Sequence, residues 1–281
     1  MFHTLLQTYM LRRRDHTRYL HRLVDNSYRA LDDGAYDYNI SVVRTHDILD
    51  LRRCIVSCPY VPIIGEIKFR SPSHGNLIDK KLRPVDIAET MINSGAVAIS
   101  VLTQPYEFHG SISHLSNIRS QTNVPILMKD IVVSEVQIST ARKIGADSIL
   151  FIKAVFDNNL AEGEIEKFLN YANRVGLGAI IEVHTQTEFA ESTKLLETSR
   201  NNIIGINNRD LNTLDVDTSV TAEILMNQDK GKNIVISESG ISDTQTIREL
   251  RRVGADGFLI GTSIIQSSDI GRKIEELSQV I

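Results

Sequence analysis

The sequence predicts an α/β protein, a (β/α)8 barrel of the TIM type with an N-terminal helical extension. Two observations predict this class: eight short apolar runs follow one another along the chain, and amphipathic helical stretches separate them. A third is their spacing, because a strand and a helix recur about every 25–35 residues, as in βαβ units of a parallel sheet. Eight such units in about 220 residues fit a closed barrel better than an open sheet.

The N-terminal part differs from the rest of the chain. We expect one barrel domain over residues 1–281, with an extension at 1–50 and a barrel core at 60–265. The extension is rich in Arg, His, Tyr and Asp, and Leu20, Leu23, Val24 and Leu31 recur at helical spacing. This pattern predicts an amphipathic helix outside the barrel.

The predicted strands are nearly all apolar, as strands covered on both faces of a parallel sheet must be. The predicted helices carry apolar residues at helical spacing. The strands are Val61–Ile67, Val97–Leu102, Pro125–Met128, Ser148–Ile152, Ala179–Val183, Ile203–Ile206, Ile234–Ser237 and Gly257–Ile260, and the clearest helices are Pro84–Asn93, Ser134–Ile144, Glu162–Val175, Thr187–Leu196 and Thr244–Val253. Gly95, Gly145 and Gly254 each follow a helix, where glycine can take the left-handed conformation that ends it.

Composition excludes several classes of function. The net charge of -4 argues against nucleic-acid binding, so we interpret the Arg12–Arg14 run as a solvated helix face. No apolar run reaches about 18 residues, so we expect no membrane span, and the N-terminus lacks a signal-peptide pattern. Cys54 and Cys58 lack a second Cys/His pair at metal-ligand spacing and are interpreted as ordinary thiols of a cytoplasmic protein. The chain contains no dinucleotide or NTP motif, and we expect neither cofactor nor metal.

Charged residues cluster where the predicted strands end. Active sites of such barrels lie at the C-terminal ends of the strands, and charges inside apolar strands are costly unless paired. Six charged residues on five strands fall at this end: Glu66, Lys68, Lys129, Glu182, Arg209 and Glu238. One alternative is a structural ion-pair network. Their concentration at one end of the barrel favours an active site.

Two glycine-containing loops predict a phosphate site. Ser239 and Gly240 follow the seventh strand, and Gly261 and Thr262 follow the eighth, where barrels commonly bind phosphate. Glycine lets backbone N–H groups approach the oxygens, and a following helix N-terminus adds a favourable dipole.

With these residues in view, the sequence resembles the indole-3-glycerol-phosphate synthase family. The similar segments run in the family's order over about residues 60–265, and together they are highly specific. They are Ile64–Lys68 with Ser71–Ser73, Ile99–Thr103, Phe108–Ser111, Pro125–Asp130, Ile181–His184, Gly205–Leu211 and Ser237–Ile241. The resemblance implies a cofactor-independent carboxy-lyase of tryptophan biosynthesis, which closes, decarboxylates and dehydrates 1-(2-carboxyphenylamino)-1-deoxyribulose 5-phosphate.

The resemblance also implies a role for each site residue. Lys129 would be the general acid of ring closure and Glu182 the general base, with Glu66 assisting proton transfer and Lys68 steadying negative charge. Ser71, Asn207, Arg209, Glu238 and Ser239 would contact substrate; Phe108, Leu211 and Ile131 would flank its aromatic ring; and Gly240, Gly261 and Thr262 would hold its phosphate. The expected partner is this phosphorylated small molecule, without nucleic acid or membrane, and the chain is expected to be a monomer or weak homo-oligomer.

The sequence departs from the family pattern at Ile131, where Phe is usual, at Arg70, where a small residue is frequent, and at Thr262, where Ser is frequent. None of these changes removes an acid, a base or a phosphate amide. A rival is another phosphosugar barrel such as phosphoribosylanthranilate isomerase, which would want a cysteine base at the end of the first strand, where this chain has Glu66 and Lys68. A non-catalytic scaffold is the other alternative, and it should have lost part of the acid–base set.

Overall fold

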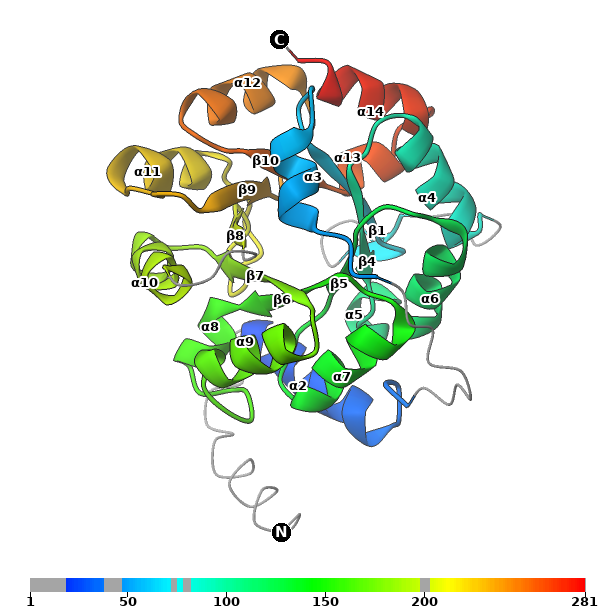
Figure 1. Ribbon diagram of the computed structural model, residues 1–281, viewed down its shortest axis with the longest axis vertical. Coiled ribbons are helices and arrows are strands. Elements are labelled where there is room, and N and C mark those ends of the chain that lie inside the picture. Colours follow the sequence, from blue (N-terminus) through cyan, green and yellow to red (C-terminus); the bar gives the residue numbers. More distant parts are fainter. Residues whose placement is uncertain (1–18, 38–46, 72–74, 78–81, 198–202, 281) are drawn as a thin grey trace.

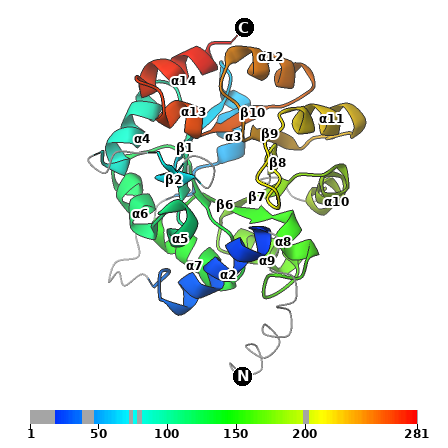
Figure 2. The ribbon, with the colours of Figure 1, turned by 180° about the vertical axis from the view of Figure 1, so that it is seen from behind.

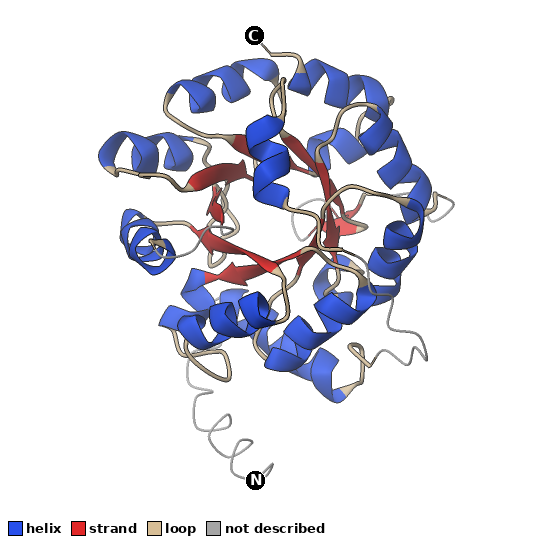
Figure 3. Ribbon diagram, viewed as in Figure 1, coloured by secondary structure: helices blue, strands red, loops and turns tan. Residues whose placement is uncertain are grey.

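A closed barrel of eight parallel strands forms the centre of the structure. It is a computed structural model that describes residues 19–37, 47–71, 75–77, 82–197 and 203–280. The strands are β1 (Ile63–Ile67), β4 (Ala98–Leu102), β5 (Ile126–Lys129), β6 (Ser148–Ile152), β7 (Gly178–Val183), β8 (Ile203–Asn207), β9 (Ile234–Glu238) and β10 (Gly257–Ile260). They pair in the order β1-β10-β9-β8-β7-β6-β5-β4, with β4 closing on β1 (Figure 3). The predicted fold class and all eight predicted strands are confirmed.

Helices surround the barrel in a ring (Figure 1). They are α4 (Pro84–Asn93), α6 (Ile112–Gln121), α7 (Glu135–Ile144), α9 (Ile165–Arg174), α10 (Gln186–Leu196), α11 (Ser219–Asn227), α12 (Thr244–Arg252) and α14 (Ile270–Ser278). The five helices predicted from apolar spacing are present, with ends that differ by up to three residues. Sequence analysis missed α6, α11 and α14. The first two have weak amphipathic patterns, whereas α14 has a clear one, with Ile274 and Leu277 on its buried face.

Shorter elements lie in the loops between strands and helices. They are α3 (Leu51–Ser57), α5 (Pro105–Phe108), α8 (Lys153–Asp157), α13 (Thr262–Ile265) and the hairpin of β2 (Arg70–Ser71) with β3 (Gly75–Asn76). The three predicted helix-ending glycines all have positive φ, between 94° and 113°. In the described residues, no helix is long and apolar enough to cross a lipid bilayer.

The two openings of the barrel are covered differently. Helix α3 lies across the opening seen in Figure 1 and buries Leu51 and Ile55. The described part of the N-terminal extension forms α2 (Tyr19–Asp32), which lies on the opposite side (Figure 2) and buries Leu20, Leu23 and Val24. The predicted amphipathic helix is thus confirmed, and the rest of the expected extension, at 1–18 and 38–46, lies outside the described residues.

The sequence Gly-Ala-Asp occurs twice before a strand, at residues 145–147 and 254–256, and its aspartate makes the same contact both times. Asp147 precedes β6 and accepts a hydrogen bond from the backbone N of Ile126, which begins β5, at 2.8 Å. Asp256 precedes β10 and accepts in the same way from Val235 of β9, at 2.7 Å. Each carboxylate is also paired with a cation, Arg119 for Asp147 and Lys230 for Asp256. The repeat therefore joins neighbouring strands at the end of the barrel away from the charged residues.

Replacing Asp147 by alanine should lower the free energy of unfolding by about 3–5 kcal/mol, because it leaves the buried Arg119 guanidinium unpaired. The carboxylate is fully buried, and it also accepts from the backbone N of Leu49, which leads into α3. Denaturant unfolding of both proteins measures the difference. Asp256→Ala is the matched control and should cost less, since the Lys230–Asp256 pair is more exposed. Equal losses in the two variants would contradict this account.

Candidate active site

A cavity of about 380 Å³ opens at the C-terminal ends of the strands. Its volume suits a small ligand, since such pockets commonly measure roughly 300–1,000 Å³. The predicted site residues that line it are Glu66, Lys68, Phe108, Lys129, Ile131, Glu182, Asn207, Arg209, Leu211, Glu238, Ser239, Gly240, Gly261 and Thr262. Ser71, the remaining predicted residue, belongs to β2, where its backbone pairs with Gly75. Residues that are far apart in sequence are thus brought to one cavity.

Lys129 occupies the centre of the charged groups. It ends β5, and its Nζ donates to Oε2 of Glu182 at 3.0 Å and to Oε2 of Glu238 at 2.6 Å. Its side chain is only 15% exposed. Burial by itself would lower the pKa of Lys129, but Glu182, Glu238 and Glu66 outweigh it and raise the pKa above the ordinary range for lysine. The group is therefore a protonated donor in the free protein.

Both oxygens of the Glu182 carboxylate are engaged. While Oε2 accepts from Lys129, Oε1 accepts from Nδ2 of Asn207 at 2.9 Å. Oδ1 of Asn207 in turn accepts from the backbone N of Arg209 at 2.9 Å, which fixes the orientation of the amide. Strand register explains the contact between Glu182 and Asn207, because Glu182 of β7 lies beside Gly205 of β8, two residues before Asn207. Glu182 is therefore held in one orientation and faces the cavity.

Glu66 and Lys68 form a second charged pair on β1 and just beyond it. Lys68 Nζ lies 2.6 Å from Glu66 Oε1, and the Glu66 side chain is 5% exposed. Burial opposes ionisation of Glu66, but Lys68 and Lys129 outweigh it and lower the pKa of the carboxyl group. Burial also lowers the pKa of the Arg209 guanidinium at the rim, although nearby Glu66 opposes that change. The cavity thus holds an ionised carboxylate between cations.

Glu238 is the most confined carboxyl group of the site. Its Oε2 accepts from Lys129, whereas Oε1 is buried and has no hydrogen-bond partner among the described residues. A Cβ at Gly205 would lie 2.3 Å from this Oε1, so the carboxyl group fits only because position 205 has no side chain. Burial raises the pKa of Glu238 to about 7, with Lys129 opposing the rise and Glu182 adding to it. Glu238 therefore titrates near neutral pH.

This raised pKa predicts a pH-dependent effect of Glu238→Gln on stability. Folded Glu238 keeps its proton up to about pH 7, whereas an ordinary glutamate loses its proton near pH 4.5. The contribution of this carboxyl group to the unfolding free energy is therefore complete below pH 4.5 and is lost as pH rises through 7. The uncharged glutamine does not titrate. The unfolding free energy of the variant, minus that of the parent, should therefore rise between about pH 5.5 and about pH 8.5. Denaturant melts at both pH values measure it.

Glu135, which is ion-paired with Lys167 and has a side chain 36% exposed, provides the control for the same pH comparison. Glu135→Gln should show a difference in unfolding free energy that hardly changes with pH. If the Glu238→Gln difference is equally constant, the carboxyl group titrates in its ordinary range.

Two backbone loops form the side of the cavity next to β9 and β10. Ser239 and Gly240 follow β9 with φ of 69° and 78°, in the left-handed region. Asn208 supports this turn by donating from Nδ2 to the carbonyl of Ser239 at 3.0 Å. Gly261 begins α13 after β10, and a Cβ there would lie 2.6 Å from Glu66 Oε1. Both glycines therefore sit where a side chain would collide, at Gly240 with Val216.

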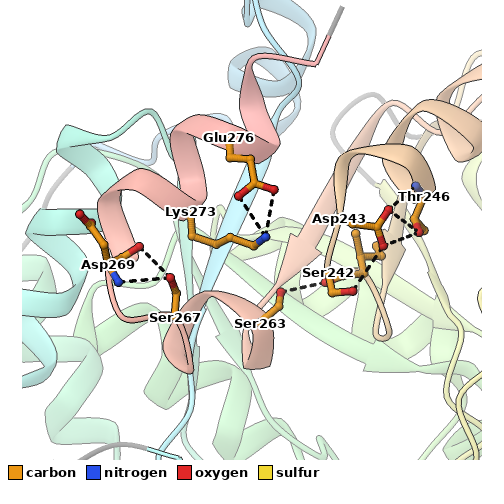
Figure 4. A network of polar contacts seen from close by, with 9 residues as sticks. Ser242, Asp243, Thr246, Ser263, Ser267, Asp269, Lys273 and Glu276 are labelled. Carbon is orange, nitrogen blue, oxygen red and sulfur yellow. Dashed lines mark hydrogen bonds and ion pairs between the residues drawn. The ribbon is translucent and has the colours of Figure 1, made fainter.

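The two loops are tied together and to the helices behind them (Figure 4). Ser263 of α13 donates from Oγ to the carbonyl of Ile241 at 2.9 Å, which joins the loop after β9 to the one after β10. Asp243 caps α12 through the backbone N of Thr246 (Figure 4), and Asp269 caps α14 through the backbone N of Arg272. These contacts fix the backbone amides of both loops relative to each other.

Some polar residues near strand ends lie outside the cavity lining. Lys153 follows β6 but belongs to α8, where it pairs with Asp157 and Glu191 on the outer side. His184 follows β7 and faces the end of the neighbouring strand β8, since its Nδ1 lies 2.8 Å from the carbonyl oxygen of Asn207. The polar groups of Lys153 and His184 are thus engaged with other residues of the fold, and neither residue lines the cavity.

Sequence reasoning missed several lining residues. Leu23 comes from α2, outside the barrel, and Asp130 follows Lys129 but its side chain accepts from Tyr36 at 2.9 Å and from Thr103. The apolar remainder includes Leu102, Leu150, Ile152 and Leu259 from the strands. Helical spacing around Leu23 did predict a buried face, but not what that face would cover.

In the described chain, no three His, Cys, Asp or Glu residues are grouped as a metal site, and Cys54 and Cys58 are free.

Comparison with known proteins decides the family. Residues 45–277 match the family model described as indole-3-glycerol phosphate synthase. The chain belongs to the indole-3-glycerol phosphate synthase family. The synthase of Aquifex aeolicus is 40% identical over 232 residues, which cover 82% of this chain and 86% of that one, and the synthase of Acetivibrio thermocellus is 38% identical over 235 residues, which cover 84% and 86%.

Members of the indole-3-glycerol phosphate synthase family are carboxy-lyases of tryptophan biosynthesis, and the chain is an enzyme of this kind. Among solved structures, a tryptophan synthase alpha chain from Legionella pneumophila superposes with a TM-score of 0.60, covering 82% of this chain and 96% of that one. Its sequence identity of 12% shows a shared barrel fold and no more.

Proposed function

We propose that the cavity binds 1-(2-carboxyphenylamino)-1-deoxyribulose 5-phosphate and converts it to indole-3-glycerol phosphate with Lys129 and Glu182 as the acid–base pair. The observation that carries the proposal is the position of the Lys129 ammonium, which lies within hydrogen-bonding distance of both Glu182 and Glu238 at the mouth of the barrel. A donor and an acceptor of protons are thus held side by side, facing one cavity.

Ring closure needs a proton donor. The aromatic carbon that bears the carboxylate attacks the ketone carbon of the sugar chain, and Lys129 protonates the ketone oxygen as the new C–C bond forms. When that oxygen replaces one carboxylate as the partner of Nζ, the influence that raises the lysine pKa weakens and the group becomes a stronger acid. The carboxylate then leaves as carbon dioxide, and its bonding electrons restore the aromatic ring.

Dehydration needs both a donor and an acceptor. The hydroxyl group formed from the ketone leaves as water after it receives a proton through the Glu66–Lys68 pair, and Glu182 removes a proton from the neighbouring carbon so that the indole double bond forms. Glu66 and Lys68 form a charged pair that can pass a proton and steady the negative charge of the substrate. Asn207 and Arg209 would orient its hydroxyl and carboxylate groups, beside Glu238, Ser239 and Ser71.

The remaining contacts divide between the two ends of the substrate. Phe108, Leu211 and Ile131 would flank the aromatic ring, and Ile131 offers a smaller apolar surface than the phenylalanine usual there. Backbone amides at Gly240, Gly261 and Thr262 would hold the phosphate, and the two glycines would let its oxygens approach the backbone closely. No cofactor enters this scheme. We also place the enzyme in the cytoplasm, where free thiols such as Cys54 and Cys58 persist, as a monomer or weak homo-oligomer.

The phosphate assignment predicts a specific loss in Gly240→Ala. A Cβ at this left-handed position would lie 2.6 Å from Val216, so the loop must shift away from the oxygens. We expect the inhibition constant of inorganic phosphate and the KM of the substrate each to rise about tenfold, which corresponds to about 1.4 kcal/mol. Initial rates with phosphate as competitor measure both.

Gly231→Ala is the matched control, because Gly231 also has positive φ but a Cβ there meets nothing within 4 Å. It should leave both constants within about twofold of the parent, well below the effect of a lost contact. Unchanged phosphate inhibition in Gly240→Ala would place the phosphate elsewhere.

Purified protein incubated with the anilino-deoxyribulose phosphate tests the proposed function directly. We expect indole fluorescence to appear together with one carbon dioxide for each indole. The chain contains no tryptophan, so its own fluorescence interferes little. Absence of both products from folded protein would overturn the proposal.

A further inference from the structure

Helix α2 forms part of the wall of the cavity. Leu23 of α2 is only 1% exposed and lines the same cavity as Lys129 and Phe108. Figure 2 shows α2 on the side of the barrel next to α5, across the barrel from α13 and the glycine loops. The extension therefore covers the end of the cavity that is remote from the proposed phosphate site.

One carboxylate holds the first half of α2 in place. Glu107 of α5 is buried, with 6% of its surface exposed, and it faces three donors from α2. Tyr19 donates from its hydroxyl at 3.1 Å, Asn26 donates from Nδ2 at 3.1 Å, and Arg22 Nη2 lies 2.6 Å away in an ion pair. These residues are three and seven positions apart, so they share one face of the helix.

Glu107 projects from a backbone that is itself fixed. Gln104 caps α5 by accepting from the backbone N of Glu107 at 2.9 Å, and His109 ends the helix with φ of 51°. A Cβ at Gly110 would lie 2.5 Å from the carbonyl oxygen of Leu102, so the chain after α5 is packed directly on the end of β4. The side chain that follows Glu107 is Phe108, which lines the cavity.

We propose that Glu107 is a positioning residue, which locks α2 over the mouth of the barrel and so holds Leu23 and Phe108 against the aromatic end of the substrate. This inference rests on the proposed function for its substrate, but the contacts between Glu107 and α2 belong to the fold and do not depend on that function. A carboxylate at this depth is costly unless it is paired, and α2 supplies the donors that pair it. Docking of α2 and burial of Glu107 therefore favour each other.

A second attachment keeps the segment on the barrel when Glu107 is removed. Tyr36, beyond the end of α2, donates to Oδ2 of Asp130 at 2.9 Å and accepts from Nε2 of Gln137 at 3.2 Å. Tyr28 also donates to the carbonyl of Leu160. Loss of Glu107 should therefore loosen the first half of α2 without releasing the segment or unfolding the barrel.

The test compares Glu107→Ala and the isosteric Glu107→Gln with the parent, with Glu135→Gln as a control for loss of an ion-paired surface glutamate. For Glu107→Ala we expect kcat/KM to fall about tenfold, because small displacements of groups that position a substrate have effects of this size. The effect of Glu107→Gln should be smaller, and Glu135→Gln should be unchanged. The inhibition constant of inorganic phosphate should stay constant in all three, since α2 lies across the barrel from α13 and the strands that the glycine loops follow (Figure 2).

A double-variant cycle separates positioning from a general structural effect. If Glu107 acts partly through Leu23, the combined Glu107→Ala/Leu23→Ala protein should lose clearly less kcat/KM than the product of the two single losses, because only the part that passes through Phe108 remains. Additive losses would overturn the proposal, and so would a Glu107→Ala protein with normal kcat/KM or with equally weakened phosphate inhibition.

Hydrogen exchange keeps this inference separable from the proposed function. Amides of residues 19–26 should exchange faster in Glu107→Ala than in the parent, while amides of residues 28–36, which the second attachment holds, and of the barrel strands should change little. If the parent does not turn over the substrate, the proposed function fails. Hydrogen exchange still tests whether Glu107 holds α2 in place, because that measurement does not depend on activity. Unchanged exchange in residues 19–26 would overturn the proposed role of Glu107 whatever the activity.

Discussion

Lys129→Ala should lower the turnover number by about 10²–10⁴-fold, the usual effect of losing a general acid. The variant lacks the donor that would protonate the ketone oxygen, so ring closure itself should fail. Because decarboxylation follows ring closure, carbon dioxide and indole should both be released slowly and in equal amounts. The KM should change much less than the turnover number, since the proposed phosphate and ring contacts remain.

Lys153→Ala is the matched control for Lys129→Ala. Lys153 is also a buried lysine that follows a strand, and it pairs with two carboxylates, Asp157 and Glu191. It lies outside the proposed site, so its loss should leave turnover close to that of the parent. Near-normal turnover in Lys129→Ala, or a failure to bind substrate at all, would contradict the assigned role.

Glu182→Gln should lower formation of indole-3-glycerol phosphate by about 10²–10⁴-fold, but by a different route. Glutamine keeps the shape of the side chain and its contact with Asn207, yet it cannot accept a proton in the dehydration step. Lys129 retains Glu238 as a partner, so ring closure and decarboxylation can proceed. Carbon dioxide should therefore appear in an early burst that exceeds indole, and mass spectrometry of quenched reactions should show a decarboxylated intermediate that still carries the hydroxyl group.

Glu191→Gln, which changes an exposed carboxylate outside the cavity, controls for loss of a charge. It should leave both products unaffected. If carbon dioxide and indole decline together in Glu182→Gln, with no accumulated intermediate, then Glu182 acts before decarboxylation and its proposed role is wrong.

The barrel could be predicted from the sequence because its strands are covered on both sides. A strand in that environment must be apolar at almost every position, so β5 and β6 are visible as runs such as Ile126–Met128 and Ser148–Ile152. Polar residues at the end of such runs then indicate the cavity, which is how Lys129 and Glu182 were found. Helices α6 and α11 were missed because their apolar periodicity is weak.

Which of these groups pair with one another follows from closure of the barrel. Lys129 and Glu238 are 109 positions apart, and they meet because strands on different sides of a closed barrel direct side chains into one mouth. The space at Gly205 that admits the Glu238 carboxyl group is a second example, since the requirement for glycine comes from a side chain on the neighbouring strand.

The sequence by itself determined the fold class, the eight strands and the charged residues at their ends, because these depend on local composition and on the period of each element. Only the tertiary structure decided that Leu23 of the extension lines the cavity, that Glu107 receives three donors from α2, and that Lys153 turns outward while Lys129 points in. Helical periodicity shows that a face is buried but not what covers it. Partners and burial, which set the protonation of a group such as Glu238, arise only when distant segments pack together.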